Sequence, residues 1–468
     1  MGGFTDRHTG MRKHVERRIF NPIVERMSRP ELDALRWRRL RSTLERTYAA
    51  SPFYRRRMQR AGVTPGDIRT PEDFRNRVPM VDKLDVLADQ REHPPLGSAV
   101  AVSEALLEYC FLTSGTSGKG QEVHVYTGAD VTESLTSWAS SLHWAGVMPG
   151  DVAYHMVPIG VTAGPVTLLA SFQRYGLRTF AVGNMEGEAR LEMMRRFAPN
   201  FFSTGPVYLR RLTTICREMG IDPRRDFPTL KAIKLGSFGF DVPWAREMEA
   251  FWGAKLIDTY ASTQCGGGIA STCEHGTYLA DGRRGMMHFP EHKIWAEVLN
   301  PQTGEPARED EEGEVILTAF GREAMPVLRF RTGDKVVFKS HRQCACGRPF
   351  DGIEAGTVSR YDTMLKIRGM NLWPEAVDAI VLAHPEIDEY NGRLGVAENG
   401  REIAKVLVEF KAAASSNAAH RAHVLEQLRS QIKECTGVGM EVCEARPGEV
   451  ERFAYKEKRW KDQRREQL

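Results

Sequence analysis

A contiguous run of glycines, hydroxyl residues and one lysine stands out in this sequence because it could hold phosphate groups. Its members are Thr113, Ser114, Gly115, Thr116, Ser117, Gly118 and Lys119. Glycines let backbone N–H groups approach phosphate oxygens, hydroxyls add donors, and the lysine adds a positive charge. The spacing differs from the Walker P-loop, which has four residues between its first glycine and its Gly-Lys pair. The residues that follow favour a strand. We therefore predict a nucleotide-phosphate loop of another kind, with a flexible surface hairpin as the alternative.

Four further segments carry residues that a nucleotide would use. They are Asp258–Gln264, Arg329–Asp334, Ser359–Gly369 and the basic stretch around Lys456. A turn aspartate can accept hydrogen bonds from ribose hydroxyls, and an arginine can pair with phosphate through two bonds. A lysine far along the chain can neutralise charge that develops at the α-phosphate. Taken singly these segments are weak signals, because Arg-Thr-Gly-Asp is common in turns and a C-terminal lysine is usually solvated.

Three cysteines have the chemistry of a metal site: Cys273 and the pair Cys344 and Cys346. Thiolates are preferred ligands of Zn²⁺. The alternative is that the closely spaced pair consists of two core thiols. Eight cysteines in 468 residues do not indicate a disulfide framework, and clustered cysteines in a reducing compartment are more often metal ligands.

Composition limits the possible classes of function. The net charge is +4, with 65 basic and 61 acidic residues, so a general nucleic-acid or membrane role is not indicated. We find no apolar run of about 18 residues that would span a membrane. The charged N-terminus lacks the apolar stretch of a secretory signal. We expect a cytoplasmic protein.

The order of predicted elements indicates an α/β fold with two domains. Residues 10–60 have helical periodicity, and residues 100–360 alternate short β-rich runs with helices, which is typical of α/β layering. Near residue 360 the pattern changes to a compact unit of strands and helices, consistent with a small α+β domain. We place the domains at residues 1–361 and 362–468.

In this order and spacing the segments resemble the adenylate-forming superfamily, and within it the phenylacetate-CoA ligase group. The resemblance covers roughly residues 40–462 and rests on several stretches: the loop at 113–119, Tyr260–Gln264, Arg331–Asp334, Ser359–Gly369, Ala50–Tyr54, Glu323–Thr332, Cys344–Arg348 and Met370–Pro374. It implies a large multi-sheet N-terminal adenylation domain and a small mobile α+β C-terminal domain. It also implies two half-reactions, in which a carboxylate and ATP give acyl-AMP and pyrophosphate, and the thiol of coenzyme A then displaces AMP.

The resemblance also assigns roles to residues. Thr113–Lys119 would hold the β- and γ-phosphates, Tyr260 would pack on adenine, and Thr263 would touch the α-phosphate. Asp334 would bind ribose, and Asp362 would be the hinge. Lys456 would be the adenylation lysine, with Lys458 as the fallback if the register differs by two. The implied nucleotide-binding set also includes Ser237, Phe238, Gly239, Asp258, Thr259, Arg360 and Arg368.

Two departures from the family pattern concern the site. The family glycine is Ala261, and the glutamate that holds Mg²⁺ in the family is Gln264. A neutral amide is a weaker Mg²⁺ ligand than a carboxylate. In addition, Gly236–Phe240 replaces the family's Gly-Ala-Glu-Pro-Trp, which lines the adenine and acid sites. Inactivity or an altered substrate is therefore an open alternative.

The resemblance extends to a structural Zn²⁺ site in some members of the group. Its ligands would be Cys273, Cys344, Cys346 and a histidine, for which His288 is the candidate and His275 the alternative. Four ligands of Cys₃His type would form a closed site without catalytic water.

The favoured activity is ligation of an aromatic carboxylic acid to coenzyme A with ATP and Mg²⁺. The alternatives are transfer of the acyl group to a carrier protein or an amine, and a non-catalytic homologue for which Gln264 is the main support. Candidate acid-pocket segments are Tyr154–Gly164, Phe202–Pro206 and Ser237–Phe240, whose aromatic and glycine content suits an aromatic ring. By analogy with the family we expect a homodimer, with no nucleic-acid or membrane partner.

Overall fold

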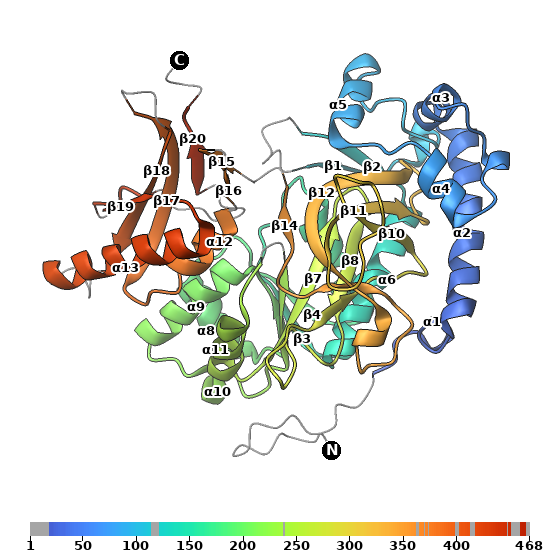
Figure 1. The fold of residues 1–468 in the computed structure, drawn as a ribbon. Coiled ribbons are helices and arrows are strands. Elements are labelled where there is room, and N and C mark those ends of the chain that lie inside the picture. Colours follow the sequence, from blue (N-terminus) through green and yellow to red (C-terminus); the bar gives the residue numbers. More distant parts are fainter. Residues whose placement is uncertain are drawn as a thin grey trace. The chain divides into compact units, whose positions relative to one another are not determined.

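The computed structural model describes residues 18–113, 121–236, 239–361, 365–368, 370–372, 374–397, 402–411, 417–446, 448–450 and 459–464. The chain divides into two compact units, one ending at Val358 and the other beginning at Ser359. The larger unit contains the long mixed sheet, and the smaller unit has a sheet and a hydrophobic core of its own (Figure 1).

Five helices open the larger unit: α1 (Pro22–Glu25), α2 (Arg29–Ala50), α3 (Pro52–Arg60), α4 (Pro71–Arg77) and α5 (Lys83–Glu92). The long helix α2 lies within the region predicted to be helical, and Leu32, Leu40 and Leu44 are buried along it. Leu40 and Leu44 pack in a core with Phe74 and Leu328, which joins these helices to the far end of the sheet.

The large sheet runs in the order β10-β11-β12-β13-β9-β8-β7-β6-β5-β3-β4. From β4 to β7 in this order, neighbouring strands are parallel. From β7 to β10, at the other end of the sheet, neighbouring strands are antiparallel. The strands are β3 (Val152–His155), β4 (Arg178–Ala181), β5 (Phe201–Ser203), β6 (Ala232–Gly236), β7 (Lys255–Ser262), β8 (Gly267–Thr272), β9 (Met286–His288), β10 (Ile294–Leu299), β11 (Glu312–Ala319), β12 (Val327–Lys339) and β13 (Gly352–Glu354).

Helices cover both faces of the parallel strands. Successive residues of a strand point to opposite faces. Accordingly Ala232 packs with Leu142 of α6 (Gly128–Ala145) and Phe172 of α7 (Ala163–Tyr175). Its neighbour Ile233 packs in a separate core with residues of α8 (Gly187–Phe197), α9 (Pro206–Glu218) and α11 (Val242–Trp252), and Trp252 closes that core. The short helix α10 (Pro223–Asp226) precedes β6. This arrangement confirms the predicted α/β layering (Figure 1).

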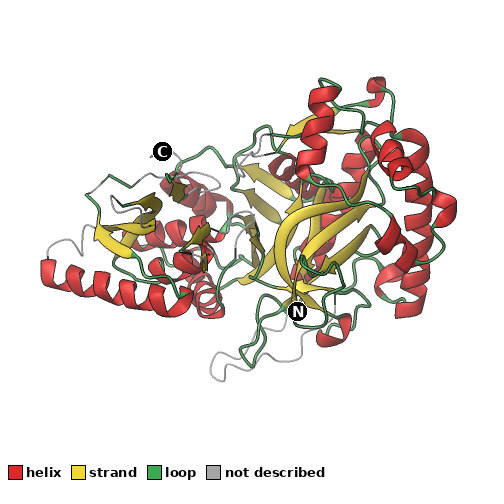
Figure 2. Ribbon diagram, turned by 45° about the horizontal axis from the view of Figure 1, so that its top comes forward, coloured by secondary structure: helices red, strands yellow, loops and turns green. Residues whose placement is uncertain are grey.

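The smaller unit is α+β, as predicted. Its sheet has the order β19-β18-β17-β20, and Val424, Leu428 and Ile432 of its long helix are buried in the core of the unit. Figure 2 shows that this unit combines helices and strands. Its elements are β14 (Ser359–Arg360), β15 (Leu365–Ile367), β16 (Met370–Leu372), α12 (Pro374–Val381), β17 (Ile387–Val396), β18 (Glu402–Phe410), α13 (Ala418–Thr436), β19 (Glu441–Glu444) and β20 (Trp460–Asp462).

None of the described helices is long and apolar enough to span a membrane.

Gly352 offers a test of how tightly the central strands are packed. It pairs with His288 across β9 and β13, and a Cβ atom at this position would overlap the carbonyl oxygen of Met287. We expect Gly352→Ala to lower the free energy of unfolding by about 1–3 kcal/mol, the usual cost of overpacking. Urea unfolding measures this change. Gly439→Ala is the control, because open space surrounds Gly439 and its substitution should leave stability nearly unchanged.

Candidate functional site

The stem of the predicted phosphate loop is an antiparallel hairpin of β1 (Tyr109–Leu112) and β2 (Val123–Tyr126). Thr113 continues the pairing, because its backbone N–H donates to the carbonyl of Glu122 at 3.0 Å and its hydroxyl accepts from the Glu122 N–H at 3.0 Å. The strand predicted after the loop is therefore confirmed. The remaining loop residues, Ser114, Gly115, Thr116, Ser117, Gly118 and Lys119, lie outside the described residues.

A buried carboxylate that the sequence analysis missed lies at the end of this hairpin. Glu122 is fully buried, and the Gln264 amide donates to its Oε2 at 3.1 Å. Its Oε1 has no hydrogen-bond partner among the described residues, and both ring nitrogens of the buried His124 also lack one. Nε2 of His124 lies 3.7 Å from Glu122, and Nζ of Lys83 lies 4.0 Å from it. Gln264 has no carboxylate of its own, but its side chain lies beside the carboxylate of Glu122.

A buried ion pair fixes the backbone of Thr263 and Gln264. Arg322 pairs with Asp130 of α6 at 3.0 Å, and both side chains are almost wholly buried. The same guanidinium donates to the carbonyls of Gln264 at 3.1 Å and Val125 at 3.0 Å. It also lies over the ring of Tyr126, 3.5 Å from the centroid. The Tyr126 hydroxyl in turn donates to the carbonyl of Thr263. One cation therefore fixes both residues of the motif to the loop hairpin.

Tyr260 and Asp334 meet although 74 positions separate them. The Tyr260 hydroxyl donates to Oδ2 of Asp334 at 2.5 Å, and both residues are buried. Burial and the neighbouring carboxylate raise the pKa of Tyr260 well above its usual value, so the hydroxyl remains a donor. The residues expected at adenine and at ribose are thus brought together. Asp334 lies within strand β12 and not in the expected turn, and the guanidinium of Arg331 in the same strand pairs with Glu314 at 2.6 Å.

Asp258 and Thr259 are both engaged with backbone groups. Oδ2 of Asp258 accepts from the N–H of Gly356 at 2.8 Å, and burial raises the pKa of this carboxyl group to about 6. The Thr259 hydroxyl donates to the carbonyl of Leu235 at 2.9 Å. These contacts connect β7 to β6 and to the turn at residues 354–358. Asp258 and Thr259 therefore support the backbone beside the site.

The segment after β6 is partly described. Ser237 and Phe238 lie outside the described residues, whereas Gly239 and Phe240 pack against Gly356. The N–H of Phe240 donates to the Gly356 carbonyl at 3.1 Å. A Cβ on Gly239 would lie 3.1 Å from the same oxygen, so a larger residue would crowd this approach.

Four predicted residues belong to the smaller unit. Arg360 ends β14, and Arg368 follows β15, where its backbone N–H donates to Glu402 and its guanidinium donates to the carbonyl of Gly439. Asp362 and Lys456 lie outside the described residues, as does Lys458, so their roles stay predictions.

The four predicted metal ligands come together. The ligand atoms of Cys273, His288, Cys344 and Cys346 all lie within 4.8 Å of one another. Sγ of Cys273 lies 3.6 Å from that of Cys344, and Sγ of Cys346 lies 3.4 Å from Nε2 of His288. Zn–S bonds of about 2.3 Å and Zn–N bonds of about 2.0 Å at tetrahedral angles separate neighbouring ligands by roughly 3.5–3.8 Å. The group thus has the dimensions of a tetrahedral site, and His275 is not part of it.

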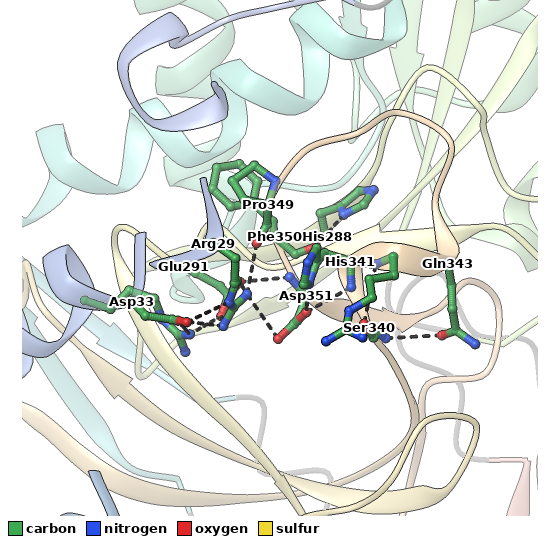
Figure 3. Close-up of polar contacts among 12 residues, drawn as sticks. Arg29, Asp33, His288, Glu291, Ser340, His341, Gln343, Pro349, Phe350 and Asp351 are labelled. Atoms are coloured by element: carbon green, nitrogen blue, oxygen red, sulfur yellow. Dashed lines mark hydrogen bonds and ion pairs between the residues drawn. The ribbon is translucent and has the colours of Figure 1, made fainter. Parts of the chain in front are cut away.

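A second layer of contacts orients His288. Its Nδ1 lies 2.9 Å from the carbonyl oxygen of Phe350, an arrangement that directs Nε2 towards the thiols. Figure 3 shows how the neighbouring Asp351 is anchored, with contacts to His341 at 2.8 Å and to Arg29 of α2 at 3.1 Å. Arg29 also pairs with Glu291 at 2.7 Å. The 349–351 turn is therefore fixed from both sides.

The family models identify both units. The model of the AMP-binding enzyme family matches residues 69–321, and that of the AMP-binding enzyme C-terminal domain matches residues 369–464. Among curated proteins, the phenylacetate-coenzyme A ligase of Thermus thermophilus is 30% identical over 452 residues, covering 93% of this chain and 97% of the relative. The enzyme of the same name from Escherichia coli is 29% identical over 440 residues, covering 92% and 94%.

Solved structures show the same fold. A 2-hydroxyisobutyryl-CoA ligase in the postadenylation state, in complex with 2-HIB-AMP, superposes with a TM-score of 0.84 at 22% identity. The match covers 99% of this chain and 95% of that one. An anthranilate CoA ligase in complex with anthranoyl-AMP matches 75% of this chain and 65% of its own, with a TM-score of 0.56 at 15% identity.

The buried pair behind the motif can be tested by removing its cation. We expect Arg322→Met to lower the free energy of unfolding by about 3–5 kcal/mol, because Asp130 is then buried without a partner. Chemical denaturation measures the loss. Arg41→Met is the control, because Arg41 and Glu45 form an exposed pair of the kind that contributes at most about 1 kcal/mol. Equal effects of the two substitutions would contradict the importance of the buried pair.

Proposed function

The chain belongs to the AMP-binding enzyme family, and on this basis we propose that it is an AMP-forming ligase that joins an aromatic carboxylic acid to coenzyme A. The observation that carries the proposal is the meeting of separated motifs in a chain that aligns over its length with such ligases. Tyr260 bonds to Asp334, and Thr263 and Gln264 are fixed beside the loop hairpin. The relatives named phenylacetate-coenzyme A ligase point to an aryl acid as the substrate.

The proposed reaction has two steps. The acid carboxylate attacks the α-phosphorus of ATP, which forms acyl-AMP and releases pyrophosphate. The sulfur of coenzyme A then attacks the acyl carbon, which forms the thioester and releases AMP. We assign phosphate binding to Thr113–Lys119 and α-phosphate contact to Thr263. Nucleotide binding is assigned to the Tyr260–Asp334 pair, and Lys456 stabilises the charge that develops in the first step.

Magnesium is a general requirement of this chemistry, and one described carboxylate suits it. Glu122 belongs to the loop hairpin, its Oε1 accepts no hydrogen bond from a described residue, and Gln264 bonds to its other oxygen. A carboxylate is the ligand type that Mg²⁺ prefers. We propose that Gln264 orients Glu122, and that the negative charge near the phosphates comes from position 122 and not from position 264. When bound, Mg²⁺ neutralises phosphate charge.

The Cys₃His group is proposed to hold a structural Zn²⁺. Three thiols and one imidazole fit a closed tetrahedral site, and the distances between ligand atoms support it. The positions of the ligands in the fold also support a structural ion. Cys273 follows β8, His288 ends β9, and the other two ligands precede β13. An ion here would link the ends of three neighbouring strands.

A second candidate function has one specific observation in its favour. Gln264 replaces the glutamate expected from the family resemblance, which favours a non-catalytic homologue if Glu122 does not substitute for it. A homodimer remains a proposal from the family resemblance. A cytoplasmic location is proposed because all eight cysteines are free, which suits a reducing compartment.

Zinc is tested by metal analysis of the purified protein. We expect about one Zn²⁺ per chain by inductively coupled plasma mass spectrometry, and nearly none in Cys346→Ser, because three ligands hold a structural ion poorly. Cys435→Ser is the control, since Cys435 is exposed and lies outside the group. A wild-type protein without zinc would refute the site.

Adenylation is tested by pyrophosphate release with ATP, Mg²⁺ and an aryl acid. We expect Lys456→Ala to lower acid-dependent release by at least about 100-fold, as for other groups that stabilise developing charge. Lys458→Ala should retain most of the activity. The reverse pattern would shift the lysine assignment by two residues. No release by wild type with any aryl acid would favour the non-catalytic homologue.

A further inference from the structure

A row of polar side chains crosses the parallel sheet next to the proposed nucleotide site. His155 of β3 pairs in register with Ser203 of β5, and Ser203 pairs with Lys234 of β6. All three are at least nine-tenths buried. Residues in register on neighbouring strands point to the same face, so the three side chains emerge together on the face covered by α6 and α7. His155 and Ser203 join at 3.1 Å through Nδ1 and Oγ.

Helix α6 adds two more polar groups to this row. Nζ of Lys234 lies 4.6 Å from the ring centroid of Trp138. Nε1 of Trp138 and Oγ of Ser134 both approach Gly267, where an added Cβ would lie 2.8 Å and 2.9 Å from them. Both side chains are more than nine-tenths buried. The glycine therefore allows these donors to lie close to the start of β8, directly after the Tyr260–Gln264 motif.

Three of these side chains carry a polar atom without a hydrogen-bond partner among the described residues. Nε2 of His155, Nε1 of Trp138 and Oγ of Ser134 form no hydrogen bond with any described residue. Lys234 forms no salt bridge with a described residue; its Nζ lies over the face of Trp138, and Asp258 is the carboxylate whose charge acts on it. Buried polar groups are nearly always paired. Several unpaired donors and one cation in a single place indicate a ligand that supplies oxygen acceptors.

The electrostatics of this row also indicate a ligand with oxygen acceptors. Burial lowers the pKa of Lys234 to about 7, and burial together with Lys234 lowers that of His155 to about 4, which leaves the imidazole neutral. The nearest carboxylate on β7, Asp258, is in register with Leu235 and so emerges on the opposite face. The charge of Asp258 partly opposes the lowering of the Lys234 pKa, but Asp258 forms no salt bridge with Lys234. An oxygen acceptor on the face that carries Lys234 would supply this missing contact.

The position matches that of a ligand. Ligands of parallel α/β sheets bind at the carboxyl ends of the strands. His155 and Ser203 are the last residues of their strands, and Nζ of Lys234 would lie 3.6 Å from a Cβ on Gly236, where β6 ends. The row therefore adjoins the segment after β6 and the motif that begins in β7.

We propose that Lys234, with Trp138, Ser134, His155 and Ser203, forms a subsite for a second oxygen-bearing group of the acid, remote from the carboxylate that is activated. The inference rests on the proposed ligase function and narrows its substrate to aromatic acids with a ring hydroxyl or a ring carboxylate. An unsubstituted ring would leave the buried donors unpaired. Sites built to bond a polar group reject analogues that lack it, by up to about 10⁴–10⁵-fold.

The test compares phenylacetate, 4-hydroxyphenylacetate and 4-carboxyphenylacetate in the pyrophosphate-release assay. Wild type should prefer a substituted acid over phenylacetate by at least about tenfold in kcat/KM. The preferred acid shows whether a ring hydroxyl or a ring carboxylate supplies the oxygen that the subsite binds. Lys234→Met should abolish or reverse this preference, and Trp138→Phe, which removes only the indole N–H, should reduce it.

Lys231→Met is the matched control, because Lys231 lies just before β6 but is exposed and pairs with Asp151 at 2.7 Å. It should leave the preference unchanged. Melting temperatures of all variants report folding. A wild type that favours phenylacetate, or a Lys234→Met variant that slows all three acids equally, would overturn the subsite.

A direct binding measurement distinguishes failure of the ligase function from failure of the subsite. If no acid releases pyrophosphate, titration calorimetry with the same three acids still decides the subsite. Tighter binding of a substituted acid by wild type, lost in Lys234→Met, supports the subsite without catalysis. Equal binding of the three acids, or none, overturns it.

Discussion

The buried ion pair of Asp130 and Arg322 is the interaction on which the geometry of the site depends. Asp130 lies in the first turn of α6, and its two oxygens also accept from the backbone N–H groups of Glu323 and Ala324. Arg322 reaches the carbonyls of Val125 and Gln264. The pair therefore joins the loop hairpin, a helix that covers the sheet and the motif after β7. Burying two charges costs free energy, so we interpret the pair as a device that fixes relative positions.

Buried polar atoms without a hydrogen-bond partner among the described residues lie at two places beside the predicted motifs. One is Glu122 with His124, in the loop hairpin; the other comprises Ser134, Trp138 and His155. We interpret both places in the same way: a cation bound to phosphate would complete the contacts of Glu122, and the acid would complete those of the second group.

Motif chemistry and strand periodicity allowed much of this to be predicted from the sequence. The α/β layering, the strand after the loop at 113–119 and the meeting of Cys273, Cys344 and Cys346 agree with the structure. Contacts between residues outside recognisable motifs could not be predicted. Asp130 and Arg322 are 192 positions apart, and Glu122 stands out only because a hairpin places it beside Gln264. The roles of Ser237, Phe238, Asp362 and Lys456 stay predictions, because these residues lie outside the described part of the chain.

The central claim is that an aryl acid passes through an acyl adenylate to a thioester, and a rapid-quench chase experiment tests it most directly. Enzyme, ATP, Mg²⁺ and acid are mixed without coenzyme A, quenched, and analysed by mass spectrometry for aryl-AMP. Coenzyme A is then added to a parallel sample. We expect up to about one aryl-AMP per active site, which disappears as aryl-CoA and AMP form in equal amounts. Formation of ADP, or of aryl-CoA without a preceding adenylate, would contradict it.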